Sequence, residues 1–237
     1  VYLLGIILTD GHLRYYRDKT KPRYGKPWYA LITQSKEKNI PLIQSAIDKL
    51  DNRFTYIHKV YGKKHVWKFN KDFADYLDTI IPNKKLNMSL IHSLTKSQIR
   101  LLLDGMILGD GCKHGTRILT SSIEQANLIQ VLVVMAGDYS NILINDNRGI
   151  HISNKIKRGK IITKNISYLV TIGESKYFHH RSTRGINHIK KLSNQKQLIW
   201  CPTVKNGTWV CRRKGKTYIT GNSTNMPCQS AASDMAL

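Results

Sequence analysis

Two aspartates, Asp10 and Asp110, occupy equivalent positions in an apolar segment that occurs twice. The first copy reads LLGIILTDG over residues 3–11, and the second reads LDGMILGDG over residues 103–111. Two carboxylates that emerge together would form a hard-oxygen site suited to Mg²⁺ or Mn²⁺. Metal ions held there could stabilise the attacking and leaving oxygens of a phosphodiester.

The alternative is that each aspartate is only the polar end of a helix. For a single copy the two interpretations are equally good. Because the same Asp-Gly pair follows the same apolar pattern twice, the metal site is the better hypothesis.

Both motif segments are expected to be helices that touch each other. Glycine inside a helix costs about 1 kcal/mol relative to alanine, yet Gly5, Gly105 and Gly109 interrupt these apolar runs. We therefore expect the two helices to approach backbone to backbone, with Asp10 and Asp110 at their ends. The glycines that follow, Gly11 and Gly111, are typical of helix C-termini.

The rest of each copy predicts strands and helices that position this pair. A strand at 29–34 or 116–121 precedes a helix at 37–50 or 123–136. A hairpin follows at 54–61 and 66–69 in the first copy, and at 139–144 and 166–172 in the second. Helices at 71–81 and 89–103 lead into the second motif. This order predicts an α+β fold built as a tandem duplication.

The composition points to a polyanionic partner. The 237 residues include 38 Lys and Arg against 15 Asp and Glu, a formal net charge of +23. Such an excess favours phosphate-rich ligands, because each neutralised phosphate releases a counterion. No apolar run reaches the roughly 20 residues of a membrane span. The four cysteines form no CxxC pair, which suits a reducing compartment.

With these residues in view, the repeated nonapeptide resembles the LAGLIDADG motif of homing endonucleases over about residues 1–195. The resemblance implies two αββαββα halves, about 1–100 and 101–195, whose antiparallel sheets form a saddle over double-stranded DNA. It also implies a monomer with pseudo-two-fold symmetry that makes a metal-dependent double-strand break at a long asymmetric target. Asp10 and Asp110 match the metal-binding position. Leu8 and Leu108 replace the earlier acidic position of the motif.

The same resemblance suggests polar residues around the metal-bound water. Gln34 and Ser121 match that position, and a basic residue after the closing helix would be Lys84 or Lys85. Gln34 and Lys85 are our catalytic candidates. Solvated lysines in a loop are an equally good interpretation of residues 84 and 85.

Basic residues gather where such a saddle would contact phosphates, although a charge run can also be a solvated face. We predict DNA contacts by two groups, one in each half. They are Arg14, Arg17, Lys19, Lys21, Arg23 and Lys26, and then Lys155, Lys157, Arg158 and Lys160.

Residues 196–222 change to short β-like runs and resemble the C-terminal end of an intein splicing domain, a small all-β Hint part. The resemblance implies that Asn222 cyclises and that Ser223 accepts the acyl group. Gly221 replaces the usual histidine before the asparagine. Cys201 together with Thr220 fits a subset of inteins in which that cysteine initiates splicing, and a buried structural thiol is the alternative.

Residues 223–237 resemble the Asn-x-Pro-x-Gln-x-x-Ala-x-Asp segment of family A DNA polymerases. Pro227, Gln229, Ala232 and Asp234 are in register. We therefore expect an intein within a polymerase, in the cytoplasm of a bacterial or phage-infected cell. An N-terminal splicing half is expected upstream of Val1.

Two other functions remain open at this point. The first is a LAGLIDADG relic or maturase that binds DNA or RNA without cutting. The second is a transcription regulator derived from the same fold, which would need a helix-turn-helix after the repeat, where β-like runs stand instead.

Overall fold

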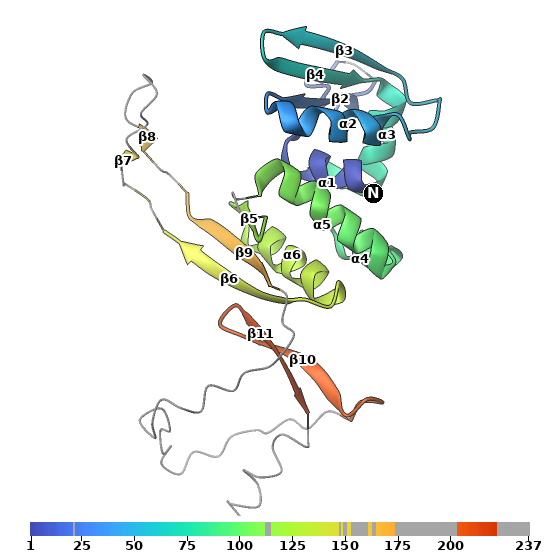
Figure 1. Ribbon diagram of the computed structural model, residues 1–237. Helices are drawn as coiled ribbons and strands as arrows, with labels where there is room; N and C mark the ends of the chain where they lie inside the picture. The colour runs from blue at the N-terminus through green and yellow to red at the C-terminus, as the bar shows by residue number, and fades with distance from the viewer. Residues whose placement is uncertain are drawn as a thin grey trace, which may run out of the picture. The chain divides into compact units, whose positions relative to one another are not determined.

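The computed structural model describes residues 1–20, 22–111, 115–146, 148, 151–152, 161–162, 165–173 and 203–221 (Figure 1). It divides into two compact units, 1–173 and 174–237. The predicted boundary at residue 195 lies outside the described residues. Within them, no helix is both long and apolar enough to cross a bilayer.

The first half of unit 1 has the predicted αββαββα order. Its elements are α1 (Tyr2–Thr9), β1 (Gly11–Tyr15), β2 (Pro27–Gln34), the 3₁₀ turn Glu37–Asn39 with α2 (Ile40–Ile47), β3 (Tyr56–Tyr61), β4 (Lys64–Phe69) and α3 (Lys71–Ile80). The strands form an antiparallel sheet in the order β1-β2-β4-β3. Strand β1 was not among the elements expected from the pattern, although Gly11 and Leu13 alternate with the exposed His12 and Arg14.

The second half repeats the arrangement with a reduced first strand. After the 3₁₀ turn Pro82–Lys84 come α4 (Met88–Ser93), α5 (Lys96–Asp110), β5 (Arg117–Thr120), α6 (Ile123–Met135), β6 (Tyr139–Asn145) and β9 (Ser167–Gly173), with the short pair β7 (His151–Ile152) and β8 (Ile161–Ile162) before β9. Strand β9 pairs antiparallel with both β5 and β6. The counterpart of β1 is a single bridge between Gly111 and Ile118.

The prediction of a single helix at 89–103 is wrong. Helix α4 ends at Ser93, and a separate helix, α5, begins at Lys96. Thr95 caps α5, accepting a hydrogen bond from the backbone of Gln98, whose side chain accepts one from the Thr95 backbone. This capping box satisfies two amides that a helix start leaves unpaired. The second motif is therefore one continuous helix that ends at Asp110 itself.

Helices α1 and α5 pack directly against each other in the centre of the unit (Figure 1). A Cβ atom added at Gly105 would lie 3.1 Å from Cα of Gly5 and would collide with the carbonyl oxygen of Tyr2. One added at Gly5 would collide with the carbonyl oxygen of Leu102. The backbones touch without intervening side chains, as the glycine spacing predicts.

A continuous apolar core lies between these helices and the sheets. It includes the fully buried Ile32, Trp67 and Phe69 in the first half and Ile118 and Val170 in the second. Helix α3 packs on β2, and α6 packs on β6 and β9. Each sheet therefore has one face covered by helices and one outer face.

Unit 2 contains one described hairpin, β10 (Thr208–Arg213) and β11 (Lys216–Gly221). Lys214 and Gly215 form its turn with φ values of 50° and 74°, which is the left-handed backbone of a tight hairpin turn. The β-like runs expected within residues 196–222 thus include these two strands. Cys201, Asn222 and Ser223 lie outside the described residues.

We expect Gly105→Ala to lower the free energy of unfolding by about 3 kcal/mol, the upper end of the usual cost of overpacking, because the added methyl group meets backbone that cannot move aside. Gly62→Ala is the control, since Gly62 has a positive φ but open space around it, and left-handed strain costs about 1–2 kcal/mol. Urea unfolding of both variants measures the difference. Equal losses would contradict the close helix contact.

Candidate active site

Asp10 and Asp110 lie at the C-terminal ends of the two paired helices. Asp10 is the C-cap of α1, and Asp110 is the last residue of α5. A Cβ atom added at Gly109 would lie 3.4 Å from the carboxyl carbon of Asp10, so this carboxylate lies against the residue before Asp110. The C-terminal end of a helix carries partial negative charge. Two such ends and two carboxylates therefore make a place that attracts cations.

The pKa of Asp110 reflects its position beside a second carboxylate. Asp110 reaches solvent, but the protein around its carboxyl group displaces enough water to raise its pKa, and the neighbouring Asp10 charge raises it further. Lys84 and Lys36 oppose this shift. The two carboxylates thus repel each other, as expected for ligands that share a cation.

Lys84 supplies a positive charge that acts on both aspartates. Its Nζ donates to the carbonyl oxygen of Thr9 at 2.7 Å and also to that of Gly11. These carbonyls lie on either side of Asp10. Burial lowers the pKa of the Lys84 ammonium group, while Asp110 and Asp10 oppose the shift.

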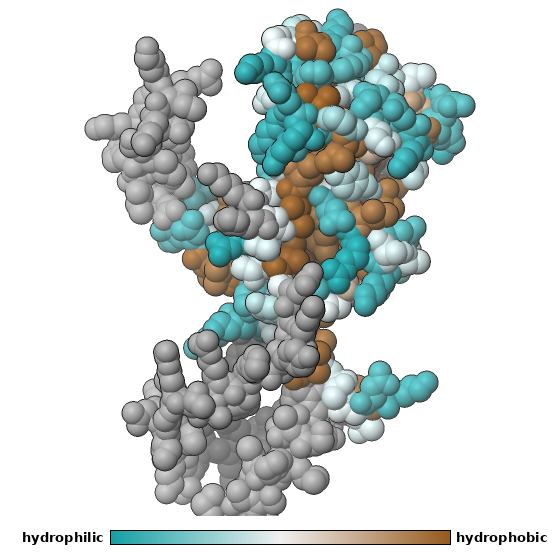
Figure 2. Space-filling model, in the orientation of Figure 1, coloured by the Kyte–Doolittle hydropathy of each residue, from teal (hydrophilic) through white to brown (hydrophobic). Residues whose placement is uncertain are grey.

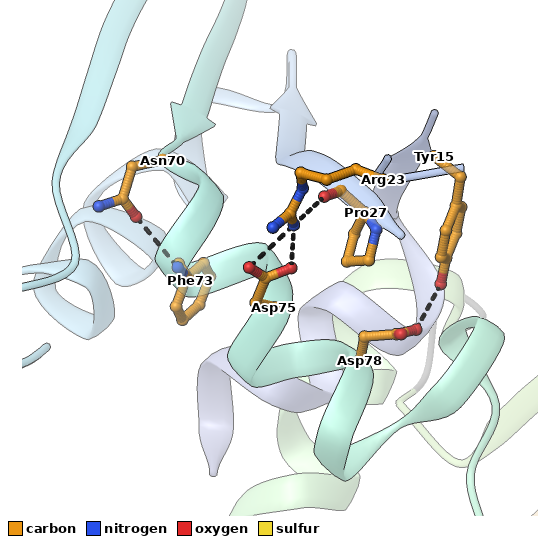
Figure 3. A network of polar contacts seen from close by, with 7 residues as sticks. All are labelled: Tyr15, Arg23, Pro27, Asn70, Phe73, Asp75 and Asp78. Carbon is orange, nitrogen blue, oxygen red and sulfur yellow. Dashed lines mark hydrogen bonds and ion pairs between the residues drawn. The ribbon is translucent and has the colours of Figure 1, made fainter. Parts of the chain in front are cut away.

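The turn that carries Lys84 is strained. Asn83 and Lys84 have φ values of 55° and 58°, a left-handed conformation that costs a non-glycine residue roughly 1–2 kcal/mol. Asp78 helps to hold this turn, because its Oδ1 accepts from the Asn83 amide at 3.4 Å and from the Tyr15 hydroxyl at 2.9 Å (Figure 3 draws the Tyr15 contact). Burial and this hydrogen bond raise the pKa of Tyr15 to about 12. Strain of this kind persists where the surrounding structure enforces it, often at functional sites.

The second half fixes the same turn from the other side. Gln125 of α6 accepts from the Leu86 amide at 2.9 Å and donates to the Leu86 carbonyl at 3.1 Å. Leu86 is two residues after Lys84. Both halves therefore determine where the Lys84 ammonium lies.

Of the two candidate lysines, the structure brings Lys84, rather than Lys85, to the backbone around Asp10. Lys85 is exposed and only lines the cavity beside Asp110. Two adjacent lysines carry no sequence signal that separates them. The distinction comes from the left-handed turn, which only the folded backbone shows.

Gln34 is buried at the end of β2. Its side-chain oxygen accepts from the amides of Ser35 and Lys36 at 3.0 and 2.9 Å. It thereby shapes the turn that carries Lys36, whose charge acts on Asp110. Lys36 was missed in the sequence, where it looks like one more basic residue before a helix.

A cavity of about 290 Å³ opens beside Asp110. Ser121 is exposed there, and Thr9, Lys84 and Leu119 also line the cavity. Hydroxyl, ammonium and carboxylate groups thus face one space in which a phosphate group could be held.

The donor set fits a hard divalent ion that shares its coordination with a substrate. Among the residues that the structure describes, no three His, Cys, Asp or Glu side chains gather around one point. Two carboxylates suffice for Mg²⁺, which commonly keeps one or two protein carboxylates and completes its shell with water and substrate phosphates. Asp10 and Asp110 are the residues that would hold it.

The outer face of the first sheet is basic. Trp67 and Phe69 of β4 are buried, so the residues next to them point outward, and the antiparallel register extends this outer face over β1, β2 and β3. The strands β1 to β4 contain no acidic residue. The exposed cations are Arg14 on β1, Lys59 on β3, and Lys64 and Lys68 on β4. Figure 2 shows mostly hydrophilic surface over this half, broken by smaller hydrophobic patches.

The predicted phosphate contacts in the first half divide into two groups. Arg14, Arg17, Lys19 and Lys26 are exposed. Arg23 instead folds onto α3, where its Nη2 lies 2.6 Å from Asp75 and donates to the Pro27 carbonyl (Figure 3). Its charge is already paired, so it anchors the basic loop.

The remaining predicted contacts are Lys21, Lys155, Lys157, Arg158 and Lys160, and all of them lie outside the described residues. Lys59, Lys64 and Lys68 were missed in the sequence. Lys68 lies between the buried Trp67 and Phe69, and that alternation was the available signal for it. Strand β3 is exposed throughout, so no such pattern marks Lys59.

No family model matches this sequence, and no curated protein matches it. Among solved structures, this chain is similar to several of the homing endonuclease I-DmoI. A structure of I-DmoI in complex with DNA and Mn has a TM-score of 0.49 and 20% identity, covering 73% of this chain and 87% of that one. A complex with DNA and Ca has a TM-score of 0.48 and 18% identity, covering 73% and 81%. A mesophilic variant of I-DmoI has a TM-score of 0.48 and 18% identity, covering 73% and 86%.

We expect Asp110→Asn to raise the free energy of unfolding at pH 7. The pKa of Asp110 is raised in the folded state, so ionising it opposes folding at every pH above its ordinary value. The gain should shrink as the pH falls from the raised pKa toward the ordinary 3.8. Urea unfolding between pH 4 and 7 measures it, with the exposed Asp104→Asn on the same helix as control. If Asp110→Asn lowers the free energy of unfolding at pH 7, the ionised Asp110 carboxylate does not destabilise the folded state and this interpretation is wrong.

Proposed function

We propose that this protein is a metal-dependent DNA endonuclease of the LAGLIDADG type. The observation that carries the proposal is the Asp10 carboxylate lying against Gly109, beside Asp110, at the joined C-terminal ends of α1 and α5. Asp110 of this pair lines a cavity, and Asp10 directly precedes β1 of the basic, acid-free sheet. The substrate is double-stranded DNA, and both strands are cut.

The target is long and asymmetric, and the protein acts as a monomer. Two unlike halves in one chain support this, because each sheet would contact a different half of the site. The first half carries four exposed cations on its outer sheet face. Outer-face side chains of a β-sheet can enter the major groove, where base edges are distinguishable.

Asp10 and Asp110 hold Mg²⁺ or Mn²⁺, ions that also occur in the I-DmoI structures. When bound, such an ion supplies charge neutralisation at the phosphate and activation of water. Lys84 places a fixed ammonium group beside the same phosphate, where it offsets developing negative charge. Gln34 fixes the turn of Lys36, and the Ser121 hydroxyl contributes a hydrogen bond to the bound phosphate or water.

We further propose that the chain is part of an intein in a family A DNA polymerase. The splice-like residues Cys201, Thr220, Asn222 and Ser223 support this, together with the polymerase-like segment at 223–237. An N-terminal splicing half would precede residue 1. The gene without the insertion is then the natural target. Because both aspartates are in place, cutting is favoured over a binding relic or a maturase.

Asp10→Asn and Asp110→Asn should each abolish cleavage while DNA binding is retained, because each removes a metal ligand and leaves the basic face intact. The assay is cleavage of a plasmid that carries the uninterrupted polymerase gene around the codons for residues 221–237, with Mg²⁺ or with EDTA. Asp104→Asn is the control and should cut like the wild type. Equal cutting by either site variant would overturn the metal assignment.

Lys84→Met should reduce the cleavage rate by about 100-fold, the usual cost of removing one preorganised donor to developing charge. Lys85→Met, one residue away, should change the rate less than threefold on the same scale. Single-turnover kinetics on the same plasmid measures both. If Lys85→Met is the more damaging change, the assignment of Lys84 is wrong.

A further inference from the structure

The outer face of the second sheet differs chemically from that of the first. On β5, β6 and β9, all fully described, Arg117 is the single charged residue. The first sheet instead carries Arg14, Lys59, Lys64 and Lys68 on its outer face. The two halves are therefore built to contact different chemical groups.

Three leucines form a row across this second sheet. Leu119 of β5 pairs with Leu169 of β9, which pairs with Leu143 of β6. The neighbouring row, Ile118, Val170 and Ile142, is buried against α6. Because successive side chains of a strand point to opposite faces, the leucine row lies on the outer face. Leu119 and Leu143 are each 47% exposed.

The leucine row begins at the candidate active site. Leu119 lines the cavity that also contains Asp110, Lys84 and Ser121. A duplex held with a phosphate at Asp110 would therefore continue over Leu119 and toward Leu169 and Leu143. Figure 2 shows hydrophobic patches beside hydrophilic ones in the region where β6 and β9 lie in Figure 1.

We propose that this leucine row reads thymine methyl groups in the half of the target that the second sheet contacts. The inference rests on the proposed DNA endonuclease function. In the major groove, thymine alone presents a C5-methyl group to an apolar side chain. Exposed leucines beside a phosphate-binding cavity on a protein with a net charge of +23 match that group better than they match phosphate or polar base edges. The two halves would then contact DNA differently. The first sheet would make charged and polar contacts, and the second would select A·T base pairs.

The first step of the test selects binding sites from random-sequence duplexes with the full chain in EDTA, so that no strand is cut. We expect the selected duplexes to be rich in A·T pairs on one side only. The best duplex is then made with thymine or with deoxyuridine on that side, which removes the methyl groups alone. Affinities are measured by fluorescence anisotropy.

Each contacted methyl group should be worth about fourfold in affinity, from about 0.8 kcal/mol per buried methylene-sized group. The wild type should therefore bind the deoxyuridine duplex at least fourfold more weakly. The double variant Leu119→Ala, Leu143→Ala, which keeps only Leu169 of the row, should lose most of this discrimination. Leu101→Ala on α5 is the matched control, because Leu101 is also 47% exposed, and it should keep the wild-type discrimination.

Three results would overturn the proposal. Equal binding of both duplexes by the wild type would show that methyl groups are not read, while DNA binding itself would stand. The wild type could instead form a dimer and bind the two duplexes equally, while the double variant is a monomer. That result would assign the leucine row to contact with a second copy of the chain. Failure to select any duplex would overturn the DNA-binding function and this inference with it.

Discussion

The close contact between α1 and α5 is the constraint on which the rest of the structure depends. Gly5 and Gly105 let the two backbones touch, and any side chain at either position would collide with the partner helix. The contact places two helix ends, each with partial negative charge, next to each other. It also fixes the separation of the two halves, because each half is built outward from its own motif helix.

The resulting pair of carboxylates opposes folding electrostatically, but the same arrangement attracts cations. Asp10 and Asp110 repel each other, and the protein accommodates this with Lys84 on a left-handed turn. That turn is held by Asp78 from the first half and, through Leu86, by Gln125 from the second. Strained turns and groups with shifted pKa values of this kind are common at functional sites.

Much of this arrangement could be predicted from the sequence because it rests on repetition. The recurring Asp-Gly motif predicted the helix pair, and the periodicities predicted most strands and helices within a few residues. The helix break at Thr95 was missed because a capping box inside an apolar run is easily taken for helix interior. Strand β1 was missed because it begins at the glycine that ends the motif.

The choice of Lys84 and the pairing of Arg23 with Asp75 could not be predicted. Both depend on contacts between residues more than 50 positions apart. Basic residues in a run look alike in sequence, and only their tertiary partners separate anchors from free cations. The contrast between the two sheet faces likewise requires the strand register, which places the three leucines in one row.

A titration of the full chain with Mn²⁺, followed by electron paramagnetic resonance of the free ion, tests most directly whether the two aspartates form one shared site. The wild type, bound to DNA from the uninterrupted gene, should remove the free-ion signal. Asp10→Asn and Asp110→Asn should each leave that signal largely intact, because each variant loses a ligand of the same site. If either variant binds Mn²⁺ as tightly as the wild type, the two carboxylates do not share a metal and the account is wrong.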